Sequence, residues 1–243
     1  MYLVADLGNT QLKLALFDQK GMVQLKKLNR ETDFDLFKEH LDSISPETPC
    51  IISSVIEEEN EIEKEITNRF KTIYLNNSSN LPLKNNYRTP ETLGQDRLAN
   101  AVACHTHHPN QNVLSIDMGT CIKYDFVNAT GEYLGGAISP GLQMRLESLS
   151  TNTGRLPLLE PEGDVAVIGG NTKESILSGV MNGIRFELEG VIEEYKRQYN
   201  DLYIVLTGGD HERFVKAFKY PIFARPNLTL EGLYYILKIN ESK

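Results

Sequence analysis

Two segments of the chain repeat one pattern of apolar and polar positions. In each, an apolar run typical of a β-strand is followed by an aspartate and, two residues later, by a glycine. The pairs are Asp6 with Gly8 and Asp117 with Gly119. The glycine lets the backbone turn close to a ligand, the small polar residues after it leave main-chain N–H groups for phosphate oxygens, and the aspartate can hold a hydrated divalent cation. The pattern therefore predicts a duplicated phosphate-binding turn.

The hydrophobic pattern around these turns predicts alternating strands and helices. Leu12, Leu14 and Leu16 alternate with polar or small residues, which indicates a strand with one apolar face after the first turn. Residues 121–127 form the equivalent strand after the second turn, and residues 76–90, without an apolar period, form a loop long enough to bind a ligand. Further strands are expected at 2–5, 22–28, 50–56, 72–75, 113–116, 133–136 and 202–206, and helices at 34–41, 57–70, 93–108, 140–149, 172–199, 210–218 and 228–237.

Composition is that of a globular protein, and its charge limits the class of partner. The 243 residues are 40% apolar and 24% charged, enough for one large domain or two small ones. A net charge of −8 without a clustered basic stripe argues against a protein that binds duplex nucleic acid. A phosphorylated ligand must then be held locally, by backbone amides, a metal ion and a few cationic side chains.

The apolar runs and the cysteines predict a compartment. No run approaches the roughly 18 apolar residues that cross a membrane, and residues 1–6 lack the basic start and apolar core of a signal peptide. Cys50, Cys104 and Cys121 are odd in number and lack metal-ligand spacing, which favours buried thiols in a reducing compartment. We expect a cytoplasmic protein that binds neither membranes nor nucleic acid.

The loop-to-helix segment at residues 87–97 holds the strongest candidate chemistry. Asp96 and Arg97 come just after Gly94, where a helix is predicted to begin. The carboxylate could face a hydroxyl, and the guanidinium or a backbone amide could face an anionic substrate. An exposed ion pair at a helix start is the structural alternative.

Short motifs of the chain also form a recognisable series. They are Asp6-x-Gly8-Asn9-Thr10, Tyr87-x-x-Pro90-x-x-x-Gly94-x-Asp96-Arg97, Asp117-x-Gly119-Thr120, Gly135-Gly136-x-Ile138-x-Pro140-Gly141, Leu156-Pro157, Gly170-Asn171-Thr172 and Thr207-Gly208-Gly209-Asp210. In this order they resemble the signature segments of the type III pantothenate kinases. The resemblance implies an α/β fold of two ribonuclease-H-like halves, as in the actin-like, sugar-kinase and heat-shock-ATPase superfamily, with nucleotide in the cleft between them. The expected halves are residues 1–112 and 113–243.

The resemblance also implies a role for each matching residue. It makes Asp96 the general base, places Asp6 near magnesium, and makes Asp117 the ligand of a monovalent cation, potassium or ammonium. Thr172 reaches pantothenate from the other subunit of a homodimer, and Thr207–Asp210 lies near the nucleoside or forms a plain strand-to-helix turn. The implied ATP-binding residues are Asp6, Leu7, Gly8, Asn9, Thr10, Gln11, Leu12, Lys13 and Thr120, and the implied substrate-binding residues are Tyr87, Gly94, Gln95, Asp96, Arg97 and Thr172.

The chain departs from the family pattern directly after the second turn. Where that pattern usually continues D-x-G-T-A-x-T-x-D, this chain has Cys121 for alanine and Lys123 for the hydroxyl residue. Cys121 is a modest enlargement that favours a packed thiol. The ammonium of Lys123 is expected to pair with Asp125, or to reach Asp117 or the phosphates.

The function implied is ATP- and magnesium-dependent phosphorylation of pantothenate to 4′-phosphopantothenate, the first step towards coenzyme A. An alternative from another class is a nucleotide-binding transcriptional accessory or scaffold protein on the same fold. A second alternative is a kinase for another small hydroxy acid. The intact Asp96-Arg97 pair and both phosphate turns favour the pantothenate kinase.

Overall fold

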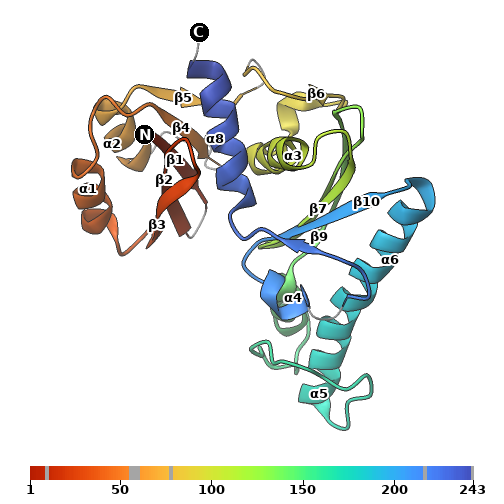
Figure 1. The fold of residues 1–243 in the computed structure, drawn as a ribbon. Coiled ribbons are helices and arrows are strands. Elements are labelled where there is room, and N and C mark those ends of the chain that lie inside the picture. Colours follow the sequence, from red (N-terminus) through yellow and green to blue (C-terminus); the bar gives the residue numbers. More distant parts are fainter. Residues whose placement is uncertain (9–10, 55–60, 77–78, 216–217, 242–243) are drawn as a thin grey trace. The chain divides into compact units, whose positions relative to one another are not determined.

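The computed structural model describes residues 1–8, 11–54, 61–76, 79–215 and 218–241 (Figure 1). The chain divides into two compact units, of which unit 1 comprises Met1–Pro109 with Asn227–Lys243 and unit 2 comprises Asn110–Pro226. The first transition lies close to the boundary expected between residues 112 and 113. The C-terminal segment, expected in the second half, groups with unit 1 because its helix packs on that unit's sheet and helices.

Unit 1 is built from a mixed sheet and flanking helices. The strands of this sheet are β1 (Tyr2–Leu7), β2 (Gln11–Phe17), β3 (Met22–Asn29), β4 (Cys50–Ser54) and β5 (Thr72–Tyr74). The short strand β6 (Lys84–Asn85) falls in the same unit but is not part of this sheet. The helices are α1 (Phe34–Asp42), α2 (Glu61–Arg69), the 3-10 turn η1 (Pro90–Thr92), α3 (Gln95–His107) and α8 (Leu228–Glu241).

Unit 2 has the same kinds of element. The strands are β7 (Asn112–Met118), β8 (Cys121–Val127), β9 (Glu132–Pro140), β10 (Leu202–Thr207) and β11 (Phe223–Ala224). The helices are α4 (Leu142–Thr151), α5 (Thr172–Leu177), the π-helical turn η2 (Ser178–Asn182), α6 (Gly183–Gln198) and α7 (His211–Phe214).

The two units repeat one sheet topology. The strand order is β3-β2-β1-β4-β5 in unit 1 and β9-β8-β7-β10-β11 in unit 2. In both, the first strand pairs antiparallel with the strand that follows it and parallel with the strand that follows a helix. Each predicted phosphate turn joins the first two strands of its unit. The prediction of an α/β fold with a duplicated half is confirmed.

Alternation along β1 sends its side chains to two faces of the sheet. Leu3 and Leu7 join the apolar core that α1 and α2 cover. Tyr2 lies on the opposite face, where its ring meets Tyr234 of α8 with the centroids 5.5 Å apart. Because Asp6 shares the parity of Tyr2, its side chain lies on the face that α8 covers.

Helices α3 and α8 pack closely side by side in unit 1 (Figure 1). A methyl group added to Gly232 of α8 would lie 1.9 Å from the carbonyl oxygen of Ala99 in α3, so only glycine permits this approach. Thr229 Oγ1 also donates to Asn100 Oδ1 over 2.8 Å. These contacts hold α3 in place, and α3 carries Asp96 at its start.

The core of unit 2 lies between its sheet and the helices α4 to α6. Ile116, Ile122 and Leu206 of the strands pack with Leu177 and Ile184 in one apolar cluster. Residues 172–198 are helical throughout, as predicted for 172–199, but a π-helical turn at η2 interrupts the α-helix.

The strand and helix predictions are confirmed for most of the described residues. The helix expected from residue 140 begins at Leu142, because β9 continues to Pro140. The two-residue strands β6 and β11 were missed, because so short a run leaves no periodic signal. The helix expected at 210–218 is described as α7, which is shorter. Residues 55–60, which include the end of a predicted strand and the start of a predicted helix, lie outside the described residues. Within the described part of the chain, every helix is too short or too polar to pass through a bilayer.

Candidate functional site

The first predicted turn follows β1 and is closed by a main-chain hydrogen bond. Gly8 N donates to Gln11 O over 3.1 Å. A methyl group added to Gly8 would lie 2.9 Å from the same carbonyl oxygen, which explains why a glycine occupies this position. Asn9 and Thr10, both predicted to bind ATP, lie outside the described residues.

A carboxylate and an ammonium face each other beside this turn. Asp6 and Lys13 are register partners on β1 and β2, and Lys13 Nζ lies 3.6 Å from Asp6 Oδ2. The Lys13 side chain keeps 35% of its surface exposed and the Asp6 side chain 17%, so both remain accessible to a ligand. The pair offers a cation for phosphate oxygens and a carboxylate for a metal ion.

The start of α3 lies at the same edge of the unit 1 sheet. Leu7, at the end of β1, is the register partner of Ser54, at the end of the parallel strand β4. Ser54 N donates to Gln95 Oε1 over 3.1 Å, which ties the first residue of α3 to that edge. The structure therefore brings together two segments that the sequence separates by about 80 residues, the phosphate turn and the predicted pantothenate segment.

Asp96 occupies the first turn of α3, where the helix dipole favours a negative charge. It is half-buried, and its Oδ1 accepts a hydrogen bond from Arg97 N over 2.8 Å. A methyl group added to Gly94 would lie 2.6 Å from this same Oδ1. Gly94 thus leaves the space in which the carboxylate lies.

The Arg97 side chain turns inward and does not form the exposed ion pair at the helix start that the sequence also allowed. The residue is buried, with 4% of its surface exposed. Its guanidinium carbon lies 5.4 Å from the centroid of the Tyr87 ring, a cation–π contact that connects the loop before η1 to α3. Tyr87 N in turn donates to Asn85 Oδ1 over 3.0 Å. The two predicted substrate-binding residues thus lie against each other.

The second predicted turn, in unit 2, is one residue shorter and is likewise closed by a hydrogen bond from its glycine. Gly119 N donates to Cys121 O over 3.1 Å, and the exposed Thr120 accepts from Gly141 N through its carbonyl oxygen over 3.1 Å. A methyl group added to Gly141 would lie 2.4 Å from Gly119 O, so α4 begins in direct contact with the turn.

Residues 207–210 pack against the other side of the second turn. Gly208 has φ +90°, which favours glycine, and an added methyl group would lie 2.4 Å from Met118 O. Asp210 N donates to that carbonyl oxygen over 3.0 Å. Burial raises the pKa of the Asp210 carboxyl, and nearby Arg213 opposes that rise. The segment forms the strand-to-helix turn that was one of its two predicted roles.

Lys123 pairs with the aspartate of the second turn. Asp117 and Lys123 are register partners on β7 and β8, and Lys123 Nζ donates to Asp117 Oδ2 over 2.9 Å. Asp125, the partner first expected for Lys123, is buried, and its Oδ1 accepts from the Tyr133 hydroxyl over 2.7 Å. The structure therefore shows the pairing with Asp117, which the sequence analysis gave as an alternative to the pairing with Asp125.

A network that the sequence analysis missed braces the start of α4. Arg145 donates from Nε to Pro140 O and from Nη2 to Ser139 Oγ, each over 2.8 Å. It also pairs with Glu187 of α6, which accepts from the Tyr124 hydroxyl over 2.8 Å. Sequence spacing carries no signal for such a network, because its members lie on four different elements.

Thr172 lies in unit 2 at the start of α5, where its side chain is exposed. The neighbouring Asn171 caps the helix, with its Oδ1 accepting from Glu174 N over 3.0 Å. The exposed threonine is available to a ligand.

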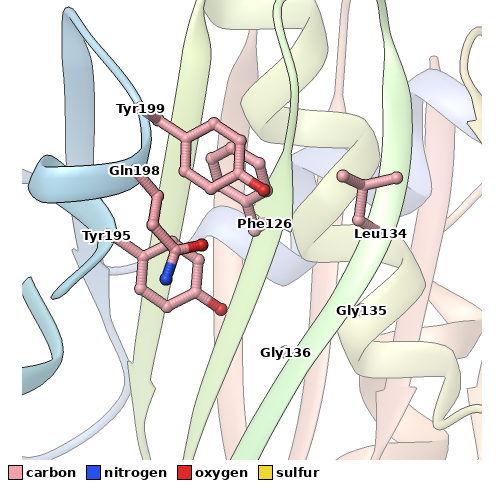
Figure 2. Close-up of a pocket in the computed structure, with 7 residues that line it drawn as sticks. All are labelled: Phe126, Leu134, Gly135, Gly136, Tyr195, Gln198 and Tyr199. Atoms are coloured by element: carbon pink, nitrogen blue, oxygen red, sulfur yellow. The ribbon is translucent and has the colours of Figure 1, made fainter.

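A pocket of about 350 Å³ opens elsewhere on unit 2 (Figure 2). Phe126 and Leu134 line it beside Gly135 and Gly136, and Tyr195, Gln198 and Tyr199 line it from the end of α6. Phe126 pairs with Leu114, at the opposite end of the β7–β8 hairpin from Asp117. The pocket is therefore separate from the phosphate turn.

The described residues hold no cluster of three or more histidine, cysteine or acidic side chains fit to bind a metal. A single carboxylate at Asp6 fits a magnesium ion that arrives with a nucleotide, because Mg²⁺ is usually held by one or two carboxylates with phosphates and water. Two units with one topology, each with an acidic-glycine turn between its first two strands, define the actin-like ATPase class of fold.

Comparisons with known proteins agree with this class. A Baf transcriptional activator family protein from Campylobacter jejuni has a similar structure, with a TM-score of 0.66, 21% identity and coverage of 99% of this chain and all of that chain. A ROK family glucokinase from Streptomyces griseus is similar at a TM-score of 0.53 and 12% identity, with coverage of 100% of this chain and 99% of that one. At such identities these likenesses bear on the fold alone.

Sequence comparison identifies the family. Residues 2–194 match the model of the type III pantothenate kinase family. The chain is 40% identical over 243 residues to the type III pantothenate kinase of Christiangramia forsetii, with full coverage of both chains. The chain belongs to the type III pantothenate kinase family.

Proposed function

We propose that this protein transfers the γ-phosphoryl group of ATP to the terminal hydroxyl of pantothenate, and that the edge of unit 1 described above carries the chemistry. The product is 4′-phosphopantothenate, and the reaction is the first step towards coenzyme A. The observation that supports this most is the position of Asp96. Its carboxylate lies half-buried at the start of α3, which Gln95 ties to the same sheet edge as the Asp6–Lys13 turn.

Asp96 is the proposed general base. Its carboxylate accepts the proton of the primary hydroxyl as the hydroxyl oxygen attacks the γ-phosphorus and the bond to the β,γ-bridging oxygen breaks. Phosphoryl transfer needs positioning and charge stabilisation and no covalent enzyme intermediate. The absence of a side chain at Gly94 leaves room for the carboxylate, and the hydrogen bond from Arg97 N holds its Oδ1 there.

ATP phosphates are assigned to the segment from Asp6 to Lys13, with Thr120 as the contact from unit 2. The Gly8 turn presents main-chain groups, and Lys13 supplies a positive charge next to Asp6. Magnesium, when bound, neutralises charge on the phosphates, and Asp6 is its proposed protein ligand.

Pantothenate is assigned to Tyr87, Thr172 and the segment from Gly94 to Arg97. The contact between the buried Arg97 guanidinium and the Tyr87 ring supports this assignment, because it brings two of the assigned residues together. The resemblance also implied a potassium or ammonium ion at Asp117, where the structure has an ion pair with Lys123.

A homodimer is the proposed assembly, with Thr172 acting in the partner's site. Unit 2 exposes large apolar side chains, of which Ile168 keeps 86% and Ile138 61% of its surface exposed. Contiguous exposed apolar side chains mark interaction sites, and the exposed Val167 and Ile168 are neighbours in the chain. Others in the same unit are Leu134, Met144, Leu158 and Phe186.

The cytoplasm is the proposed compartment. Cys50, Cys104 and Cys121 are not joined in disulfides, and Cys50 and Cys104 are buried. Cysteines without disulfides fit a reducing environment.

The test compares native protein with Asp96→Asn in an assay of ADP release with ATP and magnesium. Native protein should release ADP with pantothenate and not with pantoate or glycerate. Asp96→Asn should lower kcat by about 10²- to 10⁴-fold, because it removes the proton acceptor and keeps the shape. Nucleotide affinity, measured by calorimetry, should stay unchanged. Equal turnover by the two proteins would contradict the role of Asp96, and preference for another hydroxy acid would contradict the substrate.

A further inference from the structure

The second phosphate turn contains a positive charge supplied by the chain itself. Lys123 Nζ lies 2.9 Å from Asp117 Oδ2, and their side chains keep only 18% and 11% of their surface exposed. The corresponding pair of the first turn, Lys13 with Asp6, is longer at 3.6 Å and has a more exposed lysine. The Lys123–Asp117 pair is therefore the tighter of the two and the less screened by solvent.

This pair occupies the place where the family resemblance puts a monovalent cation. A bound potassium ion would need oxygen ligands, and the carboxylate implied as one of them already accepts a hydrogen bond from an ammonium group. A second cation on that carboxylate would meet the charge of Lys123 within a few ångströms, with little water between them. Asp117, already paired with Lys123, does not fit the implied ion.

The geometry also explains how a lysine reaches this position. β7 and β8 are antiparallel, and Asp117 and Lys123 lie directly opposite each other across the turn. Cross-strand partners have neighbouring side chains, so the register alone brings the two charges together. At the position of Lys123 the family pattern has a hydroxyl residue, and a hydroxyl group carries no charge.

We propose that Lys123 replaces the monovalent cation in this protein, so that its activity does not depend on potassium or ammonium. This inference rests on the proposed kinase function. Lys123 acts as a positioning residue, since its ammonium neutralises Asp117 beside the turn that presents Thr120. An ammonium tied to β8 does so at any salt composition.

The test measures turnover and ion binding in native protein, Lys123→Thr and Lys123→Arg. Potassium is titrated into assays whose buffer contains a large organic cation as its other monovalent cation. Native protein and Lys123→Arg should change less than about twofold, whereas Lys123→Thr should be slow without potassium and be activated about tenfold or more, because only it lacks a fixed charge. Lys219→Thr, which changes an exposed lysine of the same unit, should behave like native protein.

Binding of thallium(I), a heavy mimic of potassium, gives a readout that is independent of catalysis. Anomalous scattering from crystals soaked in thallium acetate should show an ion at Asp117 in Lys123→Thr and none there in native protein. An ion at Asp117 in native protein, or equal and steep potassium activation of native protein and Lys123→Thr, would overturn the proposal. If no protein phosphorylates pantothenate in any salt, the kinase proposal fails and the thallium result still decides the role of Lys123. Should Lys123→Thr fail to fold, the potassium response and the thallium map of native protein and Lys123→Arg decide it.

Discussion

The arrangement of Gly94 and Asp96 shows how one missing side chain positions a catalytic group. The Asp96 carboxylate lies where the side chain of any other residue at position 94 would be, because an added methyl group comes within 2.6 Å of Oδ1. Backbone does not obstruct that methyl group, so the carboxylate itself would have to move. The glycine therefore serves the position of the base more than the fold of the helix.

Gly94→Ala tests this directly. The methyl group should displace the Asp96 carboxylate and lower kcat by about 10- to 100-fold, since small misplacements of reacting groups are costly. The melting temperature should barely change, because a flexible side chain absorbs the clash. Steady-state kinetics and calorimetry measure the two effects.

Gly154→Ala is the matched control, because a methyl group added there meets nothing within 4 Å. It should leave both kcat and melting temperature as in native protein. Full activity in Gly94→Ala would contradict the proposed function of that glycine.

At this scale the sequence predicts residue types better than their partners. The motifs alone single out Asp6, Asp96 and Asp117. The sequence could not show whether Lys123 pairs with Asp117 or with Asp125, because its position on the strand puts both aspartates within reach. Only the register across the β7–β8 turn decides it.

Among the elements, α4 depends on a polar network that holds its start against the second turn. Burial raises the pKa of Glu187, but hydrogen bonds from Arg145, Tyr124 and Ser139 outweigh it and hold that pKa below the ordinary 4.5. Burial and the neighbouring Glu187 raise the pKa of the Tyr124 hydroxyl, which keeps it a donor. The network connects α4 and α6 with the sheet.

Glu187→Gln should reduce the free energy of unfolding by about 1–2 kcal/mol at neutral pH, because it leaves Arg145 without its charged partner. A carboxyl with a lowered pKa stabilises the folded state above its unfolded pKa, and this stabilisation is lost as the pH falls through the folded pKa. The difference between Glu187→Gln and native protein should therefore shrink as the pH falls below the ordinary value of 4.5 and vanish below the lowered pKa of folded Glu187. Urea unfolding from about pH 7 to about pH 3 measures it.

Glu193→Gln is the control for this experiment, since Glu193 is exposed on the same helix. It should change stability by less than about 0.5 kcal/mol at every pH. A difference for Glu187→Gln that stays constant with pH would contradict the charge of Glu187 as its cause.

Most strands and helices follow from the periodicity of apolar residues. The π-helical turn at η2 does not, because a helical pattern of apolar positions does not distinguish one extra residue in a turn from a regular helix. Nor does sequence show that α8 belongs with unit 1, which depends on the fit of Gly232 against Ala99.

For the whole molecule, the repeated topology explains why one motif occurs twice. Each unit places an aspartate at the end of its central strand and a turn directly after it. The lysine paired with this aspartate is more exposed in unit 1, where it is Lys13, than in unit 2, where it is Lys123. Different helices also cover the two sheets. We infer that the first unit supplies the catalytic base and the second the subunit contact.

The proposed dimer predicts that two inactive variants restore each other. Mixed dimers of Asp96→Asn and Thr172→Arg contain one site with both native residues. Random exchange of equal amounts makes half of the dimers mixed, so about a quarter of native activity should return. Sedimentation of the mixture should show a dimer. Full activity of native protein that sediments only as a monomer would contradict the shared site.

The central claim, transfer of phosphate to the primary hydroxyl of pantothenate, is tested most directly by phosphorus NMR of the reaction mixture. A phosphate bound to a CH₂ group couples to two protons and appears as a triplet. We expect a new triplet that grows in step with ADP, only when pantothenate is present. A doublet would place the phosphate on the secondary hydroxyl, and inorganic phosphate alone would show hydrolysis of ATP. Either result, or an unchanged spectrum, would contradict the assignment.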